Sequence, residues 1–154
     1  MSYRISGLAP ESFAPLFALS EAALRARNMR RVLIDAPHAA PCRVSLDDAA
    51  PGEEVLLLNH MHQGAQTPYR QQGPIFVSAA RERCDATGAV PPALSRRPLS
   101  LRGYDAEHMM IDADLADGAQ AQALIERLFA NPDIAYIHAH YARRGCYAAL
   151  IERA

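Results

Sequence analysis

The last third of the chain constrains the fold most, because its patterns run in the order strand, strand, helix, strand, strand. The helix is expected at residues 119–131, where Ala121, Leu124, Ile125, Leu128 and Phe129 recur at helical spacing. The four expected strands are residues 99–105, 109–115, 134–142 and 146–153. Two hairpins around one helix favour a largely antiparallel (mixed) sheet with helices packed on one side.

Alternation along these strands also predicts their registers. A three-residue loop at 106–108 closes the first hairpin, and a three-residue turn ending at Gly145 closes the second. The expected pairs are Leu101–Ala113 and Gly103–Ile111 in the first hairpin and Ala139–Ala149 and Tyr141–Tyr147 in the second. One face of the second hairpin then carries His138, His140 and Cys146.

The first half of the chain predicts shorter elements. Strands are expected at residues 3–8, 30–35, 42–46, 54–62 and 74–79, and short helices at 10–17 and after the capping residue Ser20. Residues 81–98 are expected to form a loop with one helical turn. The fold class is therefore α+β, with a single domain spanning residues 3–153.

Charge and composition exclude several classes of function. The 154 residues carry 16 basic and 17 acidic side chains, so the chain is not a strongly basic binder of nucleic acid or membrane surfaces. Every basic residue is Arg, which excludes a Schiff-base lysine and a phosphate-binding loop with its lysine. No segment reaches membrane-spanning length. The odd cysteine count and the absence of an export signal favour a cytoplasmic protein, and its oligomeric state stays open.

Four segments together resemble a known family. They are PCRVSLDDAAPGEEVLLLNH (41–60), GPIFV (73–77), YDAEHMMIDADL (104–115) and YIHAHYARRGCYA (136–148). They are similar to the bacterial family of domains of unknown function numbered 1203, and the resemblance runs from about residue 3 to the C-terminus. It implies a shared fold, and it supplies no catalytic residues.

Two His-x-His pairs are candidate metal ligands, and three of their histidines, His60, His138 and His140, are also candidate catalytic groups. His60 and His62 form the first pair, and His138 and His140 the second. On a strand, alternate residues share one face, so each pair can chelate a divalent transition metal through imidazole nitrogens. Four histidines converge if the two strands are neighbours. Histidines at strand ends that only stabilise the fold are the alternative interpretation.

Arginines in loops are candidate ligands for an anion. Arg43 follows Cys42, and Arg70 follows Tyr69 in a Pro-flanked loop. Guanidinium groups bind carboxylate or phosphate in a bidentate manner, and binding groups are frequent in loops. Arg43, Tyr69 and Arg70 are therefore the expected ligand-binding residues. Arg143-Arg144 in the last turn belongs to the same cationic group. Arginines that are merely solvated are the alternative, and this is the interpretation expected for Arg143 and Arg144.

Thiol chemistry is a third candidate. Cys42 or Cys146 is a possible nucleophile beside Arg43 or a histidine, or the two could pair on oxidation. The usual role of a cytosolic thiol is that of an inert buried side chain.

Three functions remain open at this stage. The first is a small-molecule binding protein or enzyme, with an anionic ligand held on a sheet face by His60, His138, His140 and Cys146 and at its rim by Arg43, Tyr69 and Arg70. The second is a metal-dependent enzyme that uses the two histidine pairs. The third is a non-catalytic partner-binding protein, which requires a large exposed apolar patch.

Overall fold

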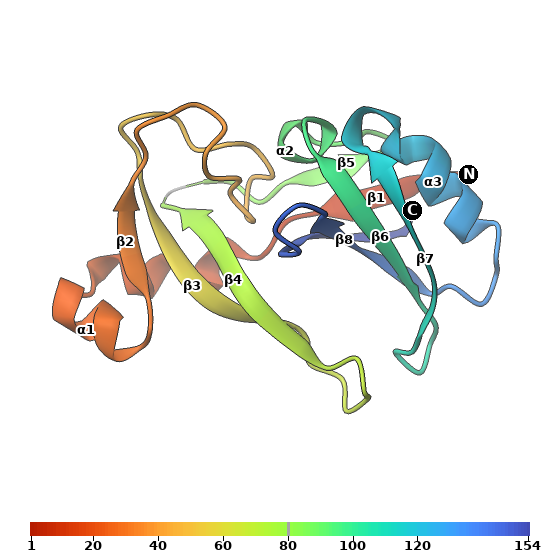
Figure 1. Cartoon of the computed structure of the whole chain (residues 1–154), viewed down its shortest axis with the longest axis horizontal. Coiled ribbons are helices and arrows are strands. Elements are labelled where there is room, and N and C mark those ends of the chain that lie inside the picture. The colour runs from red at the N-terminus through yellow and green to blue at the C-terminus, as the bar shows by residue number, and fades with distance from the viewer. Residues whose placement is uncertain (80) are drawn as a thin grey trace.

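The computed structural model describes residues 1–79 and 81–154, in which nine strands form two antiparallel sheets (Figure 1). The larger sheet has the order β5-β1-β9-β8-β6-β7 and the smaller one the order β2-β3-β4. The strands are β1 (Tyr3–Ser6), β2 (Arg30–Leu33), β3 (Glu54–Gln63), β4 (Gln71–Ser78), β5 (Asp85–Thr87), β6 (Pro98–Tyr104), β7 (Met110–Asp117), β8 (Tyr136–Tyr141) and β9 (Tyr147–Arg153). The expected α+β class is confirmed.

The helices are short and cover different parts of the two sheets. They are η1 (Pro10–Ser12), η2 (Ala14–Ala18), α1 (Glu21–Ala26), α2 (Pro92–Ser95), η3 (Gly118–Gln120) and α3 (Ala121–Phe129). The apolar stripe of α3 packs on the larger sheet in the main core, which includes Leu101 and Ile137. A second core forms between the smaller sheet and the N-terminal helices, around Phe13 and Leu58. None of the described helices is long and apolar enough to cross a membrane.

A β-bulge changes the register of the first hairpin. Next to the turn, Tyr104 pairs with Met110 as expected, but the register shifts by one residue between Tyr104 and Gly103. The predicted Gly103–Ile111 and Leu101–Ala113 pairs are therefore wrong, and Leu101 faces Asp114 instead. A bulge adds one unpaired residue to a strand and moves all later side chains to the other face. The shift leaves Ile111 exposed.

A second bulge has a larger consequence, because it changes the His-bearing face. Ala139 pairs with Ala149 as predicted, but the register then shifts, so Tyr147 faces His140 and the predicted Tyr141–Tyr147 pair is wrong. Paired residues project from the same face of a sheet. The bulge therefore brings Tyr147 to the face that carries His138 and His140.

The segment around Arg43 is a buried loop, and the expected strand at residues 42–46 is wrong apart from one isolated bridge between Cys42 and Phe76. Its backbone bonds to three different regions: Arg43 N–H donates to the Phe76 carbonyl (3.0 Å), and the Arg43 carbonyl accepts from Leu8 N–H (2.8 Å). The Val44 carbonyl accepts from Cys84 N–H (2.8 Å). These bonds satisfy a buried backbone without a ladder. Residues 85–87, expected within a loop, form the short edge strand β5 against β1.

Candidate functional site

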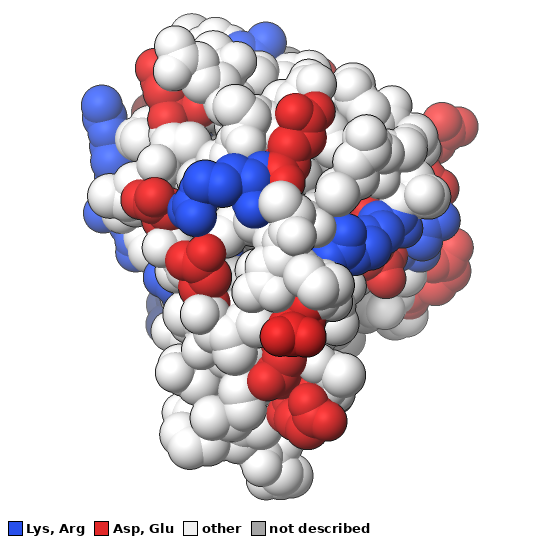
Figure 2. All heavy atoms as spheres, turned by 90° about the vertical axis from the view of Figure 1, so that its right-hand side faces the viewer, with Lys and Arg blue, Asp and Glu red and all other residues white. Residues whose placement is uncertain are grey.

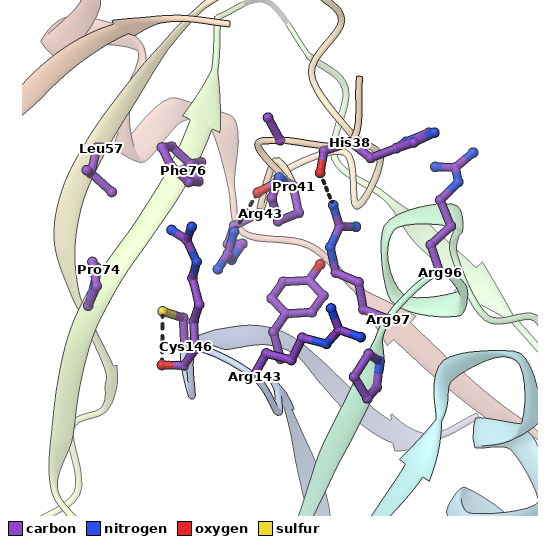
Figure 3. Close-up of a pocket in the computed structure, with 14 residues that line it drawn as sticks. His38, Pro41, Arg43, Leu57, Pro74, Phe76, Arg96, Arg97, Arg143 and Cys146 are labelled. Carbon is purple, nitrogen blue, oxygen red and sulfur yellow. Dashed lines mark hydrogen bonds between the residues drawn. The ribbon is translucent and has the colours of Figure 1, made fainter. Parts of the chain in front are cut away.

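A cavity of about 670 Å³ opens between strand β4, the β8–β9 turn and the loop before β3 (Figure 3). This volume lies within the range of small-molecule sites. Guanidinium groups dominate its polar lining, and β3 and β4 supply an apolar wall. We call it the arginine cavity, and it is lined by His38, Ala39, Pro41, Arg43, Leu57, Pro74, Phe76, Arg96, Arg97, Pro98, Tyr141, Arg143, Arg144 and Cys146.

Arg43 is the most buried cation of the cavity, with 3% of its surface exposed. Its Nε donates to the carbonyl of Tyr147 (2.7 Å) and its Nη1 to that of Pro41 (2.6 Å). These bonds tie the buried loop to β9 and fix the orientation of the guanidinium. Among the described residues, no aspartate or glutamate forms an ion pair with Arg43. Burial lowers its pKa.

Tyr141 lies between two guanidinium groups. The Arg43 carbon Cζ is 4.8 Å from the centre of its ring, and that of Arg97 is 5.3 Å away, both at cation–π distance. The Tyr141 hydroxyl is buried and has no hydrogen-bond partner among the described residues. Burial raises the pKa of Tyr141 to about 12, so the hydroxyl stays a proton donor at neutral pH. The cavity wall thus contains one donor that the protein leaves unused.

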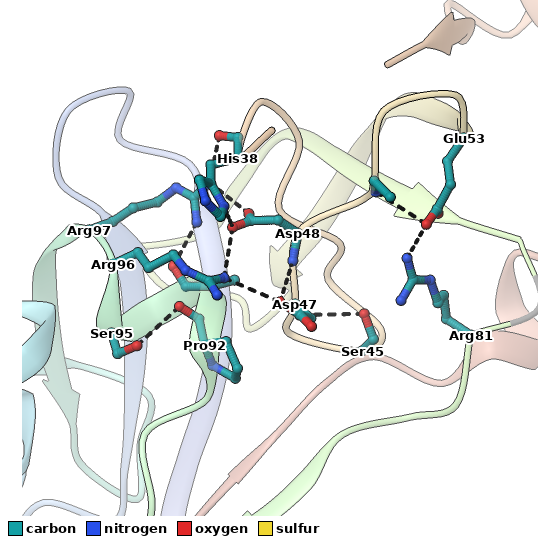
Figure 4. A network of polar contacts seen from close by, with 12 residues as sticks. His38, Ser45, Asp47, Asp48, Glu53, Arg81, Pro92, Ser95, Arg96 and Arg97 are labelled. Atoms are coloured by element: carbon teal, nitrogen blue, oxygen red, sulfur yellow. Dashed lines mark hydrogen bonds and ion pairs between the residues drawn. The ribbon is translucent and has the colours of Figure 1, made fainter. Parts of the chain in front are cut away.

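Arg96 and Arg97 differ from Arg43, because both have a carboxylate partner. The nearly buried carboxylate of Asp48 accepts from Arg97 (2.7 Å), Arg96 (3.1 Å) and His38 (2.9 Å), as Figure 4 shows. Burial raises the pKa of this carboxyl, but the hydrogen bonds from Arg97 and His38 outweigh it and hold the pKa below its usual value. The network joins the loop before β3 to the segment before β6 and so holds two walls of the cavity together.

Arg143 and Arg144 extend from the exposed β8–β9 turn at the mouth of the cavity. Neither forms an ion pair in the part of the chain that the structure describes. The face that includes β7 and α3 is different: acidic and basic side chains are interspersed there (Figure 2), and Arg127 pairs with Asp112 and Asp114. The arginine cavity therefore contains three arginines, Arg43, Arg143 and Arg144, that have no ion-pair partner among the described residues.

The four candidate histidines lie together, outside this cavity. The ring centre of His62 is 5.0 Å from that of His140 and 6.1 Å from that of His138, and the His62 ring stacks on Tyr147 at 5.2 Å. His60 contacts Tyr147 at 6.1 Å. We call these four histidines and Tyr147 the histidine layer. The two His-x-His pairs thus meet across the two sheets and do not lie on adjacent strands of one sheet.

The imidazoles of this layer are neutral at pH 7. Burial lowers the pKa of His138 and of His140 to about 3, and neighbouring cationic groups act in the same direction. Burial also lowers the pKa of His60 and His62. Neutral imidazoles contribute no charge to the attraction of an anion, so that role belongs to the guanidinium groups.

Three imidazole nitrogens of the layer are buried and have no hydrogen-bond partner in the described part of the chain: Nδ1 of His62, Nδ1 of His138 and Nε2 of His140. Nδ1 of His140 lies 2.9 Å from the Gly145 carbonyl. Within residues 1–79 and 81–154, no group of three or more His, Cys, Asp and Glu side chains lies where it could hold a metal ion. The metal-dependent enzyme therefore stays a prediction.

The remaining expected ligand residues lie apart from the arginine cavity. Tyr69 packs edge-on against Tyr104 at 6.2 Å, and Nη1 of Arg70 donates to the Gly64 carbonyl within the β3–β4 connection. Cys42 is fully buried, and its Sγ accepts from Ser78 N–H (3.3 Å). Of the expected site residues, the cavity thus brings together only Arg43 and Cys146.

Four residues that line the cavity were not expected from the sequence: His38, Arg96, Arg97 and Tyr141. One signal was present in the sequence. Arg96-Arg97 precedes Pro98 in the same way that Arg143-Arg144 precedes Gly145, so the chain has two arginine doublets in turns. Nothing in the sequence indicated that the two doublets meet.

The comparisons with known proteins identify a family and no activity. Neither a curated protein nor a solved structure matches the chain. The profile of one family, described as a protein of unknown function (DUF1203), matches residues 39–153. The matched part contains every residue of the arginine cavity except His38. The chain therefore belongs to the DUF1203 family.

Proposed function

We propose that this protein binds a small organic anion in the arginine cavity. The observation that carries the proposal is the buried guanidinium of Arg43, which faces a cavity and has no carboxylate partner among the described residues. A buried charge without a partner is unfavourable, and here two carbonyls and one aromatic ring compensate it only in part. An anion in the cavity supplies the missing negative charge.

Arg143 and Arg144 add two further unpaired cations at the mouth of the same cavity. Guanidinium groups form paired hydrogen bonds with carboxylates and phosphates. Three such groups suit a dianion such as a phosphate ester better than a single carboxylate. The buried Tyr141 hydroxyl offers one more donor to the same ligand.

The opposite wall of the cavity indicates the rest of the ligand. Leu57, Pro74 and Phe76 present apolar surface from β3 and β4. A site with an apolar wall and a few convergent polar groups is typical of small-molecule binding. The ligand therefore combines an anionic group with an apolar or aromatic body.

Calorimetric titration with phenyl phosphate tests this proposal, with inorganic phosphate and benzyl alcohol as probes of each half alone. We expect phenyl phosphate to bind more tightly than either inorganic phosphate or benzyl alcohol. The double variant Arg143→Gln/Arg144→Gln should weaken its binding at least about tenfold, because hydrogen bonds to charged groups each contribute about 1.5–3 kcal/mol.

The control is Arg25→Gln/Arg27→Gln, which changes the net charge equally. It removes two exposed arginines at the C-terminal end of α1 that form no ion pair with any described residue. It should bind phenyl phosphate like the wild type. The proposal fails if the wild type binds none of the anions, or if the cavity variant and the control lose affinity equally.

A further inference from the structure

Cys146 is the one thiol of the three that lines the arginine cavity. It is half-buried, and its Sγ donates one weak hydrogen bond among the described residues, to the Arg144 carbonyl at 3.8 Å. The other two cysteines have different surroundings. Cys42 is fully buried, and Cys84 packs against the main core beside Asp85.

Cationic groups and a buried hydroxyl surround Cys146. The buried Arg43 donates from Nε to the carbonyl of Tyr147, the residue that follows Cys146, so a fixed cation lies next to this turn. Arg143 and Arg144 lie on the other side of the thiol in sequence, and Figure 3 shows Arg43, Arg143 and Cys146 around one space. The buried and unpartnered Tyr141 hydroxyl belongs to the same wall.

We propose that Cys146 reversibly captures low-molecular-weight disulfides that carry carboxylates. The inference rests on the proposed function, since the same guanidinium groups that bind an anion would hold the carboxylates of the disulfide near Sγ. A carboxylate-bearing aromatic disulfide also matches the apolar wall formed by Leu57 and Phe76.

The reaction is a thiol–disulfide exchange. Cys146 gives its thiol proton to solvent, and the thiolate attacks one sulfur of the disulfide. A bond forms between Sγ and that sulfur, while the original S–S bond breaks. The second sulfur leaves as a thiolate with the electron pair and takes up a proton from solvent. The products are a mixed disulfide on Cys146 and one free thiol, and excess thiol reverses the reaction.

The experiment compares two aromatic disulfides that differ in charge. The probes are 5,5′-dithiobis(2-nitrobenzoate), which is a dianion, and 4,4′-dithiodipyridine, which is uncharged. Reaction rates are measured by absorbance on Cys84→Ser, which keeps Cys146, and on Cys146→Ser, which keeps Cys84. For each protein, the rate constant for the dianion is divided by the rate constant for the uncharged probe. This ratio is then normalised by the same ratio measured for free N-acetylcysteine.

We expect the normalised ratio to be at least about 10 for Cys84→Ser and 1 or less for Cys146→Ser. Adding Arg143→Gln/Arg144→Gln to the Cys84→Ser protein should lower the ratio at least threefold, whereas adding Arg25→Gln/Arg27→Gln should not change it. A ratio of 1 for Cys84→Ser, or equal ratios in the two arginine backgrounds, overturns the inference.

Titration of the Cys146→Ser protein with phenyl phosphate separates the two proposals. If this protein binds phenyl phosphate but Cys146 shows no preference for the dianion, the disulfide inference fails and the proposed function stands. If phenyl phosphate does not bind but the charge preference is present, the proposed function fails and the preference of Cys146 stands.

Discussion

Acidification should destabilise this protein through the histidine layer at a pH where its carboxylates still carry their charge. Burial holds the pKa of His138 and His140 at about 3, against 6.5 for an exposed imidazole. A lowered folded-state pKa means that the unfolded chain binds protons first. The stabilising contribution is complete above pH 6.5 and is lost as the pH falls from 6.5 toward 3.

The size of the effect follows from the same pKa values. At pH 5.0 each imidazole is protonated in the unfolded chain and neutral in the folded one. Because this pH lies about 1.5 units below the pKa of the unfolded imidazole, each group lowers the free energy of unfolding by about 2 kcal/mol. His138 and His140 together should therefore lower the free energy of unfolding by about 4 kcal/mol between pH 7.5 and 5.0. The lowered pKa values of His60 and His62 act in the same direction.

Urea unfolding followed by circular dichroism at pH 7.5 and 5.0 measures this loss directly. The double variant His138→Gln/His140→Gln should lose about 4 kcal/mol less than the wild type over the same interval. The exposed His108 supplies the control, since His108→Gln should keep the full pH dependence. A wild-type loss below about 1 kcal/mol, or an equal loss in the double variant, would refute the argument from burial.

Two further predictions concern the scaffold of the site, and each has a control substitution. Gly7→Ala should lower the free energy of unfolding by about 1–3 kcal/mol and weaken phenyl phosphate binding, because an added Cβ would collide with the Val44 carbonyl. Gly73→Ala should change either measurement little, since its added Cβ meets nothing within 4 Å. Asp48→Asn should cost about 1–3 kcal/mol in urea unfolding, because it removes the nearly buried carboxylate that Arg96 and Arg97 share. Arg127→Gln should cost less than about 1 kcal/mol, since its ion pairs are exposed, and a larger loss would contradict that ranking.

Local sequence patterns predicted much of the larger sheet. The helical spacing of residues 119–131 predicted α3 together with its buried face, and the alternation in the final hairpin predicted the Ala139–Ala149 pair. Ser20 was expected to cap a helix, and its Oγ accepts from Ala23 N–H (3.1 Å). These features depend on residues that are close together in the chain, so local sequence patterns are enough to predict them.

The β-bulges of the two hairpins β6–β7 and β8–β9 could not be predicted in the same way. Each hairpin keeps its expected register on one side of the bulge and differs by one residue on the other. In the final hairpin the bulge allows Tyr147 to stack on His62, a residue of the other sheet. Packing between the sheets therefore accompanies a local change in pairing that no strand pattern encodes.

The candidate site was predicted only in part, because most of its contacts join distant segments. The expectation of Arg43 as a binding residue rested on its place in a Pro-flanked segment next to a loop, and the sequence did not indicate that it would be buried. The grouping of Arg43 with His140 and Arg70 into one pocket also required tertiary information. The structure divides these residues among the arginine cavity, the histidine layer and the β3–β4 connection.

A crystal structure of the protein with phenyl phosphate tests the central claim most directly. The account predicts a phosphate oxygen about 3 Å from Nη2 of Arg43, the guanidinium nitrogen with no hydrogen bond to the described residues, and a phenyl ring against Phe76. Phosphate bound elsewhere on the surface, with Arg43 still bonded only to the Tyr147 and Pro41 carbonyls, would contradict it.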